Sequence, residues 1–249
     1  MTATNGGDPH VFGRSKDNRL SERLVRRFFY KYYARNLLYE LQIRARGSSV
    51  DYIQANMADA MMFPNRKAMF AHCMQTAPTE GLVLEFGVAQ GASTRQLASM
   101  TDRQVHGFDS FQGLPEDWSG TEELQGKFST GGTLPDVPAS VTLHPGWFED
   151  SIPKFKDDFS DPVALIHVDC DLYSSARMVL FAMADRLKPG TVVIFDEYFN
   201  YPNWQQHEFR AFQEFVDAFD VEYRYLGFSI KNGHVAVVLT KIKTQLAQS

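Results

Sequence analysis

From residue 81 onward the sequence alternates short apolar runs with helix-like segments, and this alternation restricts the fold more than any other feature. Glycine-containing turns separate the runs, and the segments between them space their apolar residues as helices do. Strands that alternate with helices are typical of a parallel sheet covered on both faces. The expected strands are residues 82–88, 104–109, 141–146, 162–169 and 191–196, and the expected helices are residues 92–100, 174–187 and 206–219.

The C-terminal region departs from this alternation. Residues 221–229 and 234–242 form two further apolar runs, and the segment between them is too short for a parallel crossover. A hairpin is the connection that such a length allows. We therefore predict an α/β fold with a Rossmann-like, doubly wound sheet of seven strands whose last strand is antiparallel.

Residues 1–80 precede the predicted sheet and are expected to belong to the same domain as the core at 81–249. The first twenty or so residues are polar and aperiodic, which predicts a mobile arm. Residues 21–46 have helical apolar spacing, and short helices are expected around 50–61 and 65–76. The helix at 21–46 is rich in basic and aromatic residues; we expect it to pack on the core, with a contribution to a lid or a homodimer contact. Membrane contact is the less favoured alternative.

Composition excludes several classes of protein. The net charge of −5 argues against a nucleic-acid surface and favours a small-molecule partner. Cys73 and Cys170 lie far apart in no metal-binding spacing, which favours a reducing compartment. The N-terminal residues do not resemble a signal peptide, and no apolar run reaches the length of a membrane span. A cytoplasmic protein is the expectation.

A glycine turn follows the first expected strand, in the segment EFGVAQGAS at 85–93. Gly87 and Gly91 allow the backbone to approach a ligand, although a plain tight turn explains the pattern equally well. Asp109 ends the next strand, where a carboxylate can accept both hydroxyls of a ribose. Together these residues predict a nucleotide site at the carboxyl ends of the strands.

The residues around this turn favour S-adenosylmethionine over a dinucleotide. Thr94 and Arg95 stand where a dinucleotide fold prefers a third glycine. Glu85 would repel a pyrophosphate but can receive an α-amino group. A nicotinamide dehydrogenase and a catalytically inactive nucleotide-binding module remain the alternatives from other classes.

Two neighbouring strands each end in a pair of acids, Asp169 with Asp171 and Asp196 with Glu197. Neighbouring strands lie roughly 5 Å apart, so these carboxylates should converge. Their mutual repulsion would raise their pKa values unless a cation is bound. Oxygen ligands of this kind suit Mg²⁺, with Mn²⁺ as a substitute.

The order and spacing of five motifs resemble the macrocin O-methyltransferase family of class I methyltransferases, which are metal-dependent and methylate sugar hydroxyls of natural products. The motifs are EFGVAQGAS, FDSFQGLPEDW, HPGWFEDSIP, HVDCDLYSSA and KPGTVVIFDEYFNYPNW. The resemblance covers Gly81 to the C-terminus. It implies an O-methyltransferase acting on a sugar of a small molecule or glycolipid, with a catechol-type phenol as the rival acceptor. For the cofactor it implies Glu85, Phe86, Gly87, Gly91, Ser93, Asp109, Ser110, Phe111, Trp147 and Phe148, the last two equally explained as core aromatics.

The same resemblance assigns roles to the acids. It implies Asp169, Asp196 and Glu197 as metal ligands and Asp171 as the general base. Glu197 departs from the family, which usually has aspartate there, and this puts its direct coordination in doubt. In the aromatic loop that follows, Tyr201, Trp204 and His207 either line the acceptor pocket or pack the loop, and His207 is a candidate second base. A lone histidine in an apolar strand, His167, is expected to be a hydrogen-bonded core residue.

Overall fold

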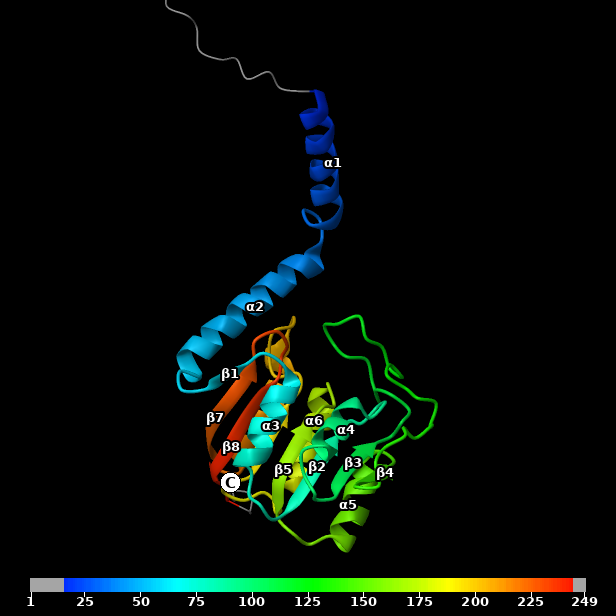
Figure 1. Ribbon diagram of the computed structural model, residues 1–249, viewed down its shortest axis with the longest axis vertical. Helices are drawn as coiled ribbons and strands as arrows, with labels where there is room; N and C mark the ends of the chain where they lie inside the picture. The colour runs from blue at the N-terminus through cyan, green and yellow to red at the C-terminus, as the bar shows by residue number, and fades with distance from the viewer. Residues whose placement is uncertain (1–15, 244–249) are drawn as a thin grey trace, which may run out of the picture. The chain divides into compact units, whose positions relative to one another are not determined.

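The computed structural model describes residues 16–243, and within them one mixed sheet forms the centre of the fold. Its strand order is β1-β7-β8-β6-β5-β2-β3-β4 (Figure 1). All neighbouring strands are parallel except β8, which pairs antiparallel with both β6 and β7. The strands are β1 (Met61–Phe63), β2 (Leu82–Phe86), β3 (Val105–Asp109), β4 (Val141–Pro145), β5 (Val163–Val168), β6 (Val192–Phe195), β7 (Glu222–Ser229) and β8 (Val235–Lys241).

The predicted α/β class, the seven strands and the antiparallel last strand are confirmed, but the sheet has an eighth strand. This strand, β1, pairs parallel with β7 at the edge of the sheet. It has three residues, and two of them are exposed. So short a segment carries neither the length nor the alternation by which strands are recognised in a sequence.

Helices cover both faces of the sheet (Figure 1). α3 and α4 pack on one face, and α5, α6 and α7 pack on the other. A short 3₁₀ helix, Trp204–Gln206, precedes α7. The helix bounds are α3 (Arg66–Thr76), α4 (Ala92–Ala98), α5 (Phe148–Asp158), α6 (Tyr173–Met183) and α7 (Glu208–Ala218).

The N-terminal helices differ from the prediction of one helix over 21–46. The chain forms α1 (Lys16–Tyr32) and α2 (Leu37–Asn56), so α1 starts within the predicted arm. The break has a local cause, because the side chain of Asn36 accepts a hydrogen bond from the N–H of Tyr39 at 3.2 Å. Asparagine is a preferred N-cap residue and starts a new helix here. The rest of the predicted arm, residues 1–15, lies outside the described residues, and the helix expected around 50–61 is the end of α2.

The described chain divides into two compact units between Leu41 and Gln42. Residues 42–80 therefore belong to the same compact unit as the sheet. The reason is burial, since Ala45 in α2 is already part of the core. No helix among the described residues is both long and apolar enough to cross a membrane.

Two hydrophobic layers fix the position of the site. Along β2, Leu84 and Phe86 belong to the layer under α5–α7, whereas Val83 belongs to the layer under α3 and α4. This alternation follows from the period of two in a strand, and burial on both faces explains the continuous apolar runs. At the end of the sheet, the rings of Phe86 and Phe108 stack at 4.5 Å. The turns that follow these strands are thus held on a rigid base.

Candidate active site

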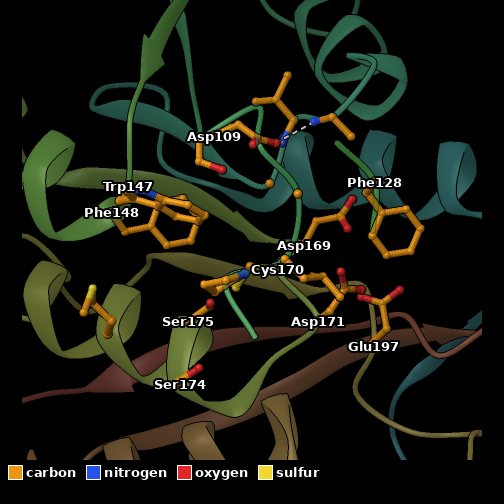
Figure 2. A pocket seen from close by; sticks show the side chains of 18 of the residues that line it. Asp109, Phe128, Trp147, Phe148, Asp169, Cys170, Asp171, Ser174, Ser175 and Glu197 are labelled. Carbon is orange, nitrogen blue, oxygen red and sulfur yellow. Dashed lines mark hydrogen bonds between the residues drawn. The ribbon is translucent and has the colours of Figure 1, made fainter. Parts of the chain in front are cut away.

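A cavity of about 780 Å³ opens at the carboxyl ends of the central strands. Its walls come from the turns after β2, β3, β5 and β6, and from the start of α5 and α6. Figure 2 shows three acids, Asp169, Asp171 and Glu197, grouped on one side and two aromatic residues, Trp147 and Phe148, on the other. This is the edge of an open α/β sheet where ligands bind.

The glycine turn after β2 lies against the turn after β5. Gly87 has a φ of 98°, and a Cβ atom at this position would overlap the carbonyl oxygen of Asp169. Only glycine allows both the left-handed backbone and this close approach. Gly91 caps the start of α4 with a φ of 75° and does not line the cavity. The turn therefore connects the predicted nucleotide side directly to the acid side.

Asp109 organises the nucleotide side through its own hydrogen bonds. Its Oδ2 accepts from the N–H groups of Val88 at 2.9 Å and Ala89 at 2.7 Å, as the dashed lines of Figure 2 mark. Its Oδ1 accepts from the N–H of Phe111 at 2.6 Å. A carboxylate has about four acceptor sites, so this side chain retains capacity for a ligand hydroxyl. Asp109 lines the cavity, as do Ser110 and Ser93.

Aromatic side chains form the wall opposite the acids. Trp147 and Phe148 start α5 and line the cavity, and Phe148 meets Phe86 edge to face at 5.4 Å. Phe128, from the long segment between β3 and β4, lines the cavity as well, but in Figure 2 it lies on the side of the acids. The sequence did not identify Phe128, because a single aromatic residue in a long loop carries no periodic or motif signal.

Three carboxylates converge on the acid side. Asp169, Asp171 and Glu197 each place an oxygen within 4.8 Å of the others. The turn that holds the first two is tight, because Asp171 has a left-handed φ of 61°. Burial, with the neighbouring acids, raises the pKa of Asp169 and of Glu197 well above their usual range and that of Asp171 to about 7. Among the described residues, Glu197 Oε2 is buried and has no hydrogen-bond partner.

The fourth acid, Asp196, does not line the cavity. Its Oδ1 lies 3.2 Å from Arg66 Nη1, 3.0 Å from His234 Nδ1 and 3.4 Å from His167 Nε2. Although burial opposes ionisation, the close contacts with His167 and His234 hold the pKa of Asp196 well below its usual range. The role of Asp196 as a metal ligand stays a prediction. Asp196 and Glu197 lie in the bend that follows β6, and only Glu197 lines the cavity.

Glu85 is likewise engaged elsewhere. It is fully buried in β2, the hydroxyl of Thr94 donates to its Oε2, and His167 Nδ1 lies 2.9 Å from its Oε1. Burial lowers the pKa of His167, but the contacts with Asp196 and Glu85 outweigh burial and raise it to about 10. His167 is therefore a hydrogen-bonded core residue, as expected, and it joins two acids that had been assigned to cofactor and metal.

The remaining predicted residues divide between the cavity and the core. His207 is 5% exposed, does not line the cavity, and lies 5.9 Å from Tyr201 and 6.0 Å from Trp118 between ring centres. Burial lowers its pKa. Six residues predicted for the cofactor, the metal or catalysis thus lie off the cavity wall because they are buried in the core or in turns: Glu85, Phe86, Gly91, Phe111, Asp196 and His207. Tyr201 and Trp204, the other two aromatic candidates, do not line the cavity either and pack against the core.

Arg66 is a cavity residue that sequence reasoning missed. It starts α3, lines the cavity, and lies 3.8 Å from Asp169 Oδ2 as well as beside Asp196. Asp196 and Asp169 raise its pKa against the effect of burial. Arg66 is distant in sequence from both acids, and one arginine in a helical segment gives no signal of such a contact.

Together, the strand order, the glycine turn and the cavity at the carboxyl ends of the strands define a Rossmann-like fold with a ligand site. Residues 84–198 match a family model described as a methyltransferase domain. The chain is 28% identical over 172 residues to an 8-demethyl-8-(2,3-dimethoxy-alpha-L-rhamnosyl)-tetracenomycin-C 4'-O-methyltransferase of Streptomyces olivaceus. That alignment covers 57% of this chain and 64% of the relative, so it spans less than two thirds of the relative's length.

Solved structures agree on the fold. The calicheamicin methyltransferase CalS11 superimposes with a TM-score of 0.55 at 19% identity, covering 94% of this chain and 99% of that one. The O-methyltransferase NovP superimposes with a TM-score of 0.54 at 22% identity, covering 71% of this chain and 80% of that one. These comparisons confirm the predicted resemblance to sugar O-methyltransferases and the methyltransferase type of the fold.

Proposed function

We propose that the chain is an S-adenosylmethionine-dependent O-methyltransferase that methylates a sugar hydroxyl of a small molecule. The observation that carries the proposal is one cavity with two chemically different walls. A glycine turn with a strand-end acid forms one wall, and a cluster of three carboxylates forms the other. The sugar O-methyltransferase among the relatives supports the choice of acceptor.

The residues present suit the cofactor. Gly87 lets the turn after β2 lie directly against the backbone of Asp169, Asp109 can accept a ribose hydroxyl, and Trp147 and Phe148 offer flat surfaces to an adenine. S-adenosylmethionine would supply a methyl group on a positively charged sulfur. The aromatic wall and the buried base of the cavity would exclude water from the transfer.

The acid cluster suits a hard divalent cation such as Mg²⁺. Asp169 and Glu197 offer carboxylate oxygens within 4.8 Å of each other, and Glu197 Oε2 lacks a protein partner among the described residues. Such an ion would lower the pKa of an acceptor hydroxyl. Arg66 and the two histidines, His167 and His234, keep Asp196 ionised as a charged support behind the cluster.

Asp171 is the proposed general base. It lines the cavity beside Asp169 and Glu197, and its pKa of about 7 suits a group that accepts a proton near neutral pH. Proton removal matters because an aliphatic hydroxyl is a poor nucleophile at that pH. His207 is buried off the cavity and has no part in the proposal.

A product assay tests the function. The protein is incubated with S-adenosylmethionine and a panel of glycosides, nucleotide sugars and catechols, and methylated products are identified by mass spectrometry. We expect a methylated sugar, loss of turnover in EDTA and its return with Mg²⁺. A methylated catechol would show that the acceptor is a phenol and not a sugar. Full turnover in EDTA, with the metal content verified, would contradict the proposed role of the metal. Calorimetry that detected NAD but not S-adenosylmethionine would reject the whole proposal.

A further inference from the structure

A buried acid outside the cavity connects the two turns that carry the cavity acids. Glu208 is the first residue of α7; it is 0% exposed and does not line the cavity. Its Oε2 accepts a hydrogen bond from the N–H of Glu197 at 3.1 Å, and its Oε1 accepts one from the N–H of Cys170 at 3.4 Å. A buried carboxylate is costly unless its oxygens are bonded, and here each oxygen has a backbone donor.

The two donor N–H groups, of Cys170 and Glu197, lie in the turns beyond the last paired residues of β5 and β6. The pairing of β5 with β6 ends at Val168 and Phe195, and the last ladder bond runs from the N–H of Asp196 to the carbonyl of Val168 at 3.0 Å. Cys170 and Glu197 lie beyond that point. Because Cys170 stands between Asp169 and Asp171, one side chain of α7 spans the two turns from which all three carboxylates of the acid cluster come.

We propose that Glu208 is a positioning residue that sets the spacing of the carboxylate cluster formed by Asp169, Asp171 and Glu197. It acts through the backbone of both turns and touches neither the cavity nor a substrate. The inference rests on the proposed function, since the spacing of the cluster matters for a cation held by it. A carboxylate in a first helical turn also interacts favourably with the helix dipole, so a purely structural role is the competing explanation.

The substitution Glu208→Gln separates these explanations. Glutamine has the same size but keeps one acceptor, and its NH₂ group faces a backbone N–H, so one of the two turns is released. Glu214→Gln, on the same helix, is the matched control. Glu214 bonds the side chains of Tyr173, Arg177 and Arg210 and contacts neither acid turn.

The full-length variants are titrated with Mn²⁺ by calorimetry in the presence of S-adenosylhomocysteine, with S-adenosylhomocysteine alone, and by thermal unfolding. We expect Glu208→Gln to weaken Mn²⁺ binding by about 10- to 100-fold, the range for residues that orient metal ligands, while affinity for S-adenosylhomocysteine changes by less than about twofold. Glu214→Gln should leave both affinities unchanged.

Several outcomes would overturn the inference. Normal Mn²⁺ affinity in a folded Glu208→Gln protein would do so, as would an equal loss of Mn²⁺ and S-adenosylhomocysteine binding, which indicates a general structural effect. If Glu208→Gln does not fold, Glu208→Asp keeps the charge but is too short to reach both turns, and the same selective loss of Mn²⁺ binding is expected; normal Mn²⁺ binding there would also overturn it. Wild-type protein that methylates its acceptor but binds no Mn²⁺ would contradict the metal site of the proposed function instead.

Discussion

The two walls of the cavity differ in how completely the protein supplies hydrogen-bond partners for their polar groups. On the nucleotide side, the carboxylate of Asp109 accepts three backbone N–H groups, so the protein's own hydrogen bonds hold the turn. On the acid side, burial and mutual repulsion raise the pKa values of Asp169, Asp171 and Glu197. The first wall is stabilised by hydrogen bonds within the protein, whereas the second carries crowded carboxylates that protons or a cation would neutralise.

This difference predicts which property a substitution on each wall will change. A turn whose polar groups are hydrogen-bonded within the protein does not depend on a ligand for its conformation. Crowded carboxylates lose free energy when they ionise together, so their arrangement depends on what neutralises them. Substitutions on the nucleotide side should therefore change cofactor binding alone, and substitutions on the acid side should change chemistry or metal binding alone.

The largest effect is expected for Asp171→Asn on the acid side. The amide keeps the shape of the carboxylate but cannot accept the hydroxyl proton, so kcat should fall by about 10²- to 10⁴-fold. Affinity for S-adenosylmethionine and for Mg²⁺ should stay nearly unchanged, and higher pH should restore part of the rate. Initial rates and calorimetry measure these quantities. Glu116→Gln, which also lines the cavity but bonds Ser174, serves as the control.

Loss of Mg²⁺ affinity in Asp171→Asn would change this assignment. Asp171 would then be a ligand, which its place within the carboxylate cluster permits. Loss of S-adenosylmethionine affinity instead would break the comparison, because the two walls would not be independent.

A smaller effect is expected for Asp109→Ala on the nucleotide side. Removing the charge-assisted bonds to a ribose should weaken S-adenosylmethionine binding by ~1–3 kcal/mol, and loss of the three backbone bonds adds disorder in the turn. Mg²⁺ affinity should change little. Isothermal titration with each ligand provides the test, after circular dichroism has shown that the variant is folded. An unaltered cofactor affinity would rule out the ribose assignment.

The nucleotide side could be predicted from sequence more completely than the acid side, for a physical reason. Gly87 comes directly after β2, and Asp109 is the last residue of β3. Both contact backbone groups at the ends of neighbouring strands, so their positions follow from the strand pattern. The family resemblance assigned Asp196 to the metal, and in the structure its carboxylate also contacts Arg66 and His234, which come from distant segments. Such partners are fixed by tertiary packing and leave no local pattern.

Position in the sequence does not show which of two adjacent acids faces the cavity. Asp196 and Glu197 both lie in the bend after β6, yet only Glu197 lines the cavity. The roles of Glu208 and Phe128 could not be read from the sequence either. Each acts from a helix or loop whose position depends on the whole fold, and neither belongs to a motif.

The smallest expected effect concerns the pH dependence of stability, to which a group below the nucleotide side and a group on the acid side contribute with opposite sign. Beneath the nucleotide side, His106 Nδ1 lies 3.0 Å from His144 Nε2, and burial, with the neighbouring His144, lowers the pKa of His106 to about 4. An unfolded histidine titrates near 6.5, so between about pH 6.5 and pH 4 the unfolded state binds more protons and stability falls as pH decreases. For Asp171, whose folded pKa is raised to about 7, the sign is reversed and stability falls as pH rises from about 4 to 7.

His106→Phe should therefore flatten the acid limb of the stability profile and leave the limb above pH 7 unchanged. Phenylalanine suits the site, because the rings of Phe155 and Phe159 lie 5.0 Å and 4.6 Å from the imidazole. The change in slope should be a fraction of the ~1.4 kcal/mol per pH unit that one proton allows. Urea unfolding in EDTA between pH 4.5 and pH 8 measures it, with His72→Gln on α3 as the control. If the acid limb of His106→Phe kept the wild-type slope, the loss of stability at low pH would have to come from groups other than this histidine pair.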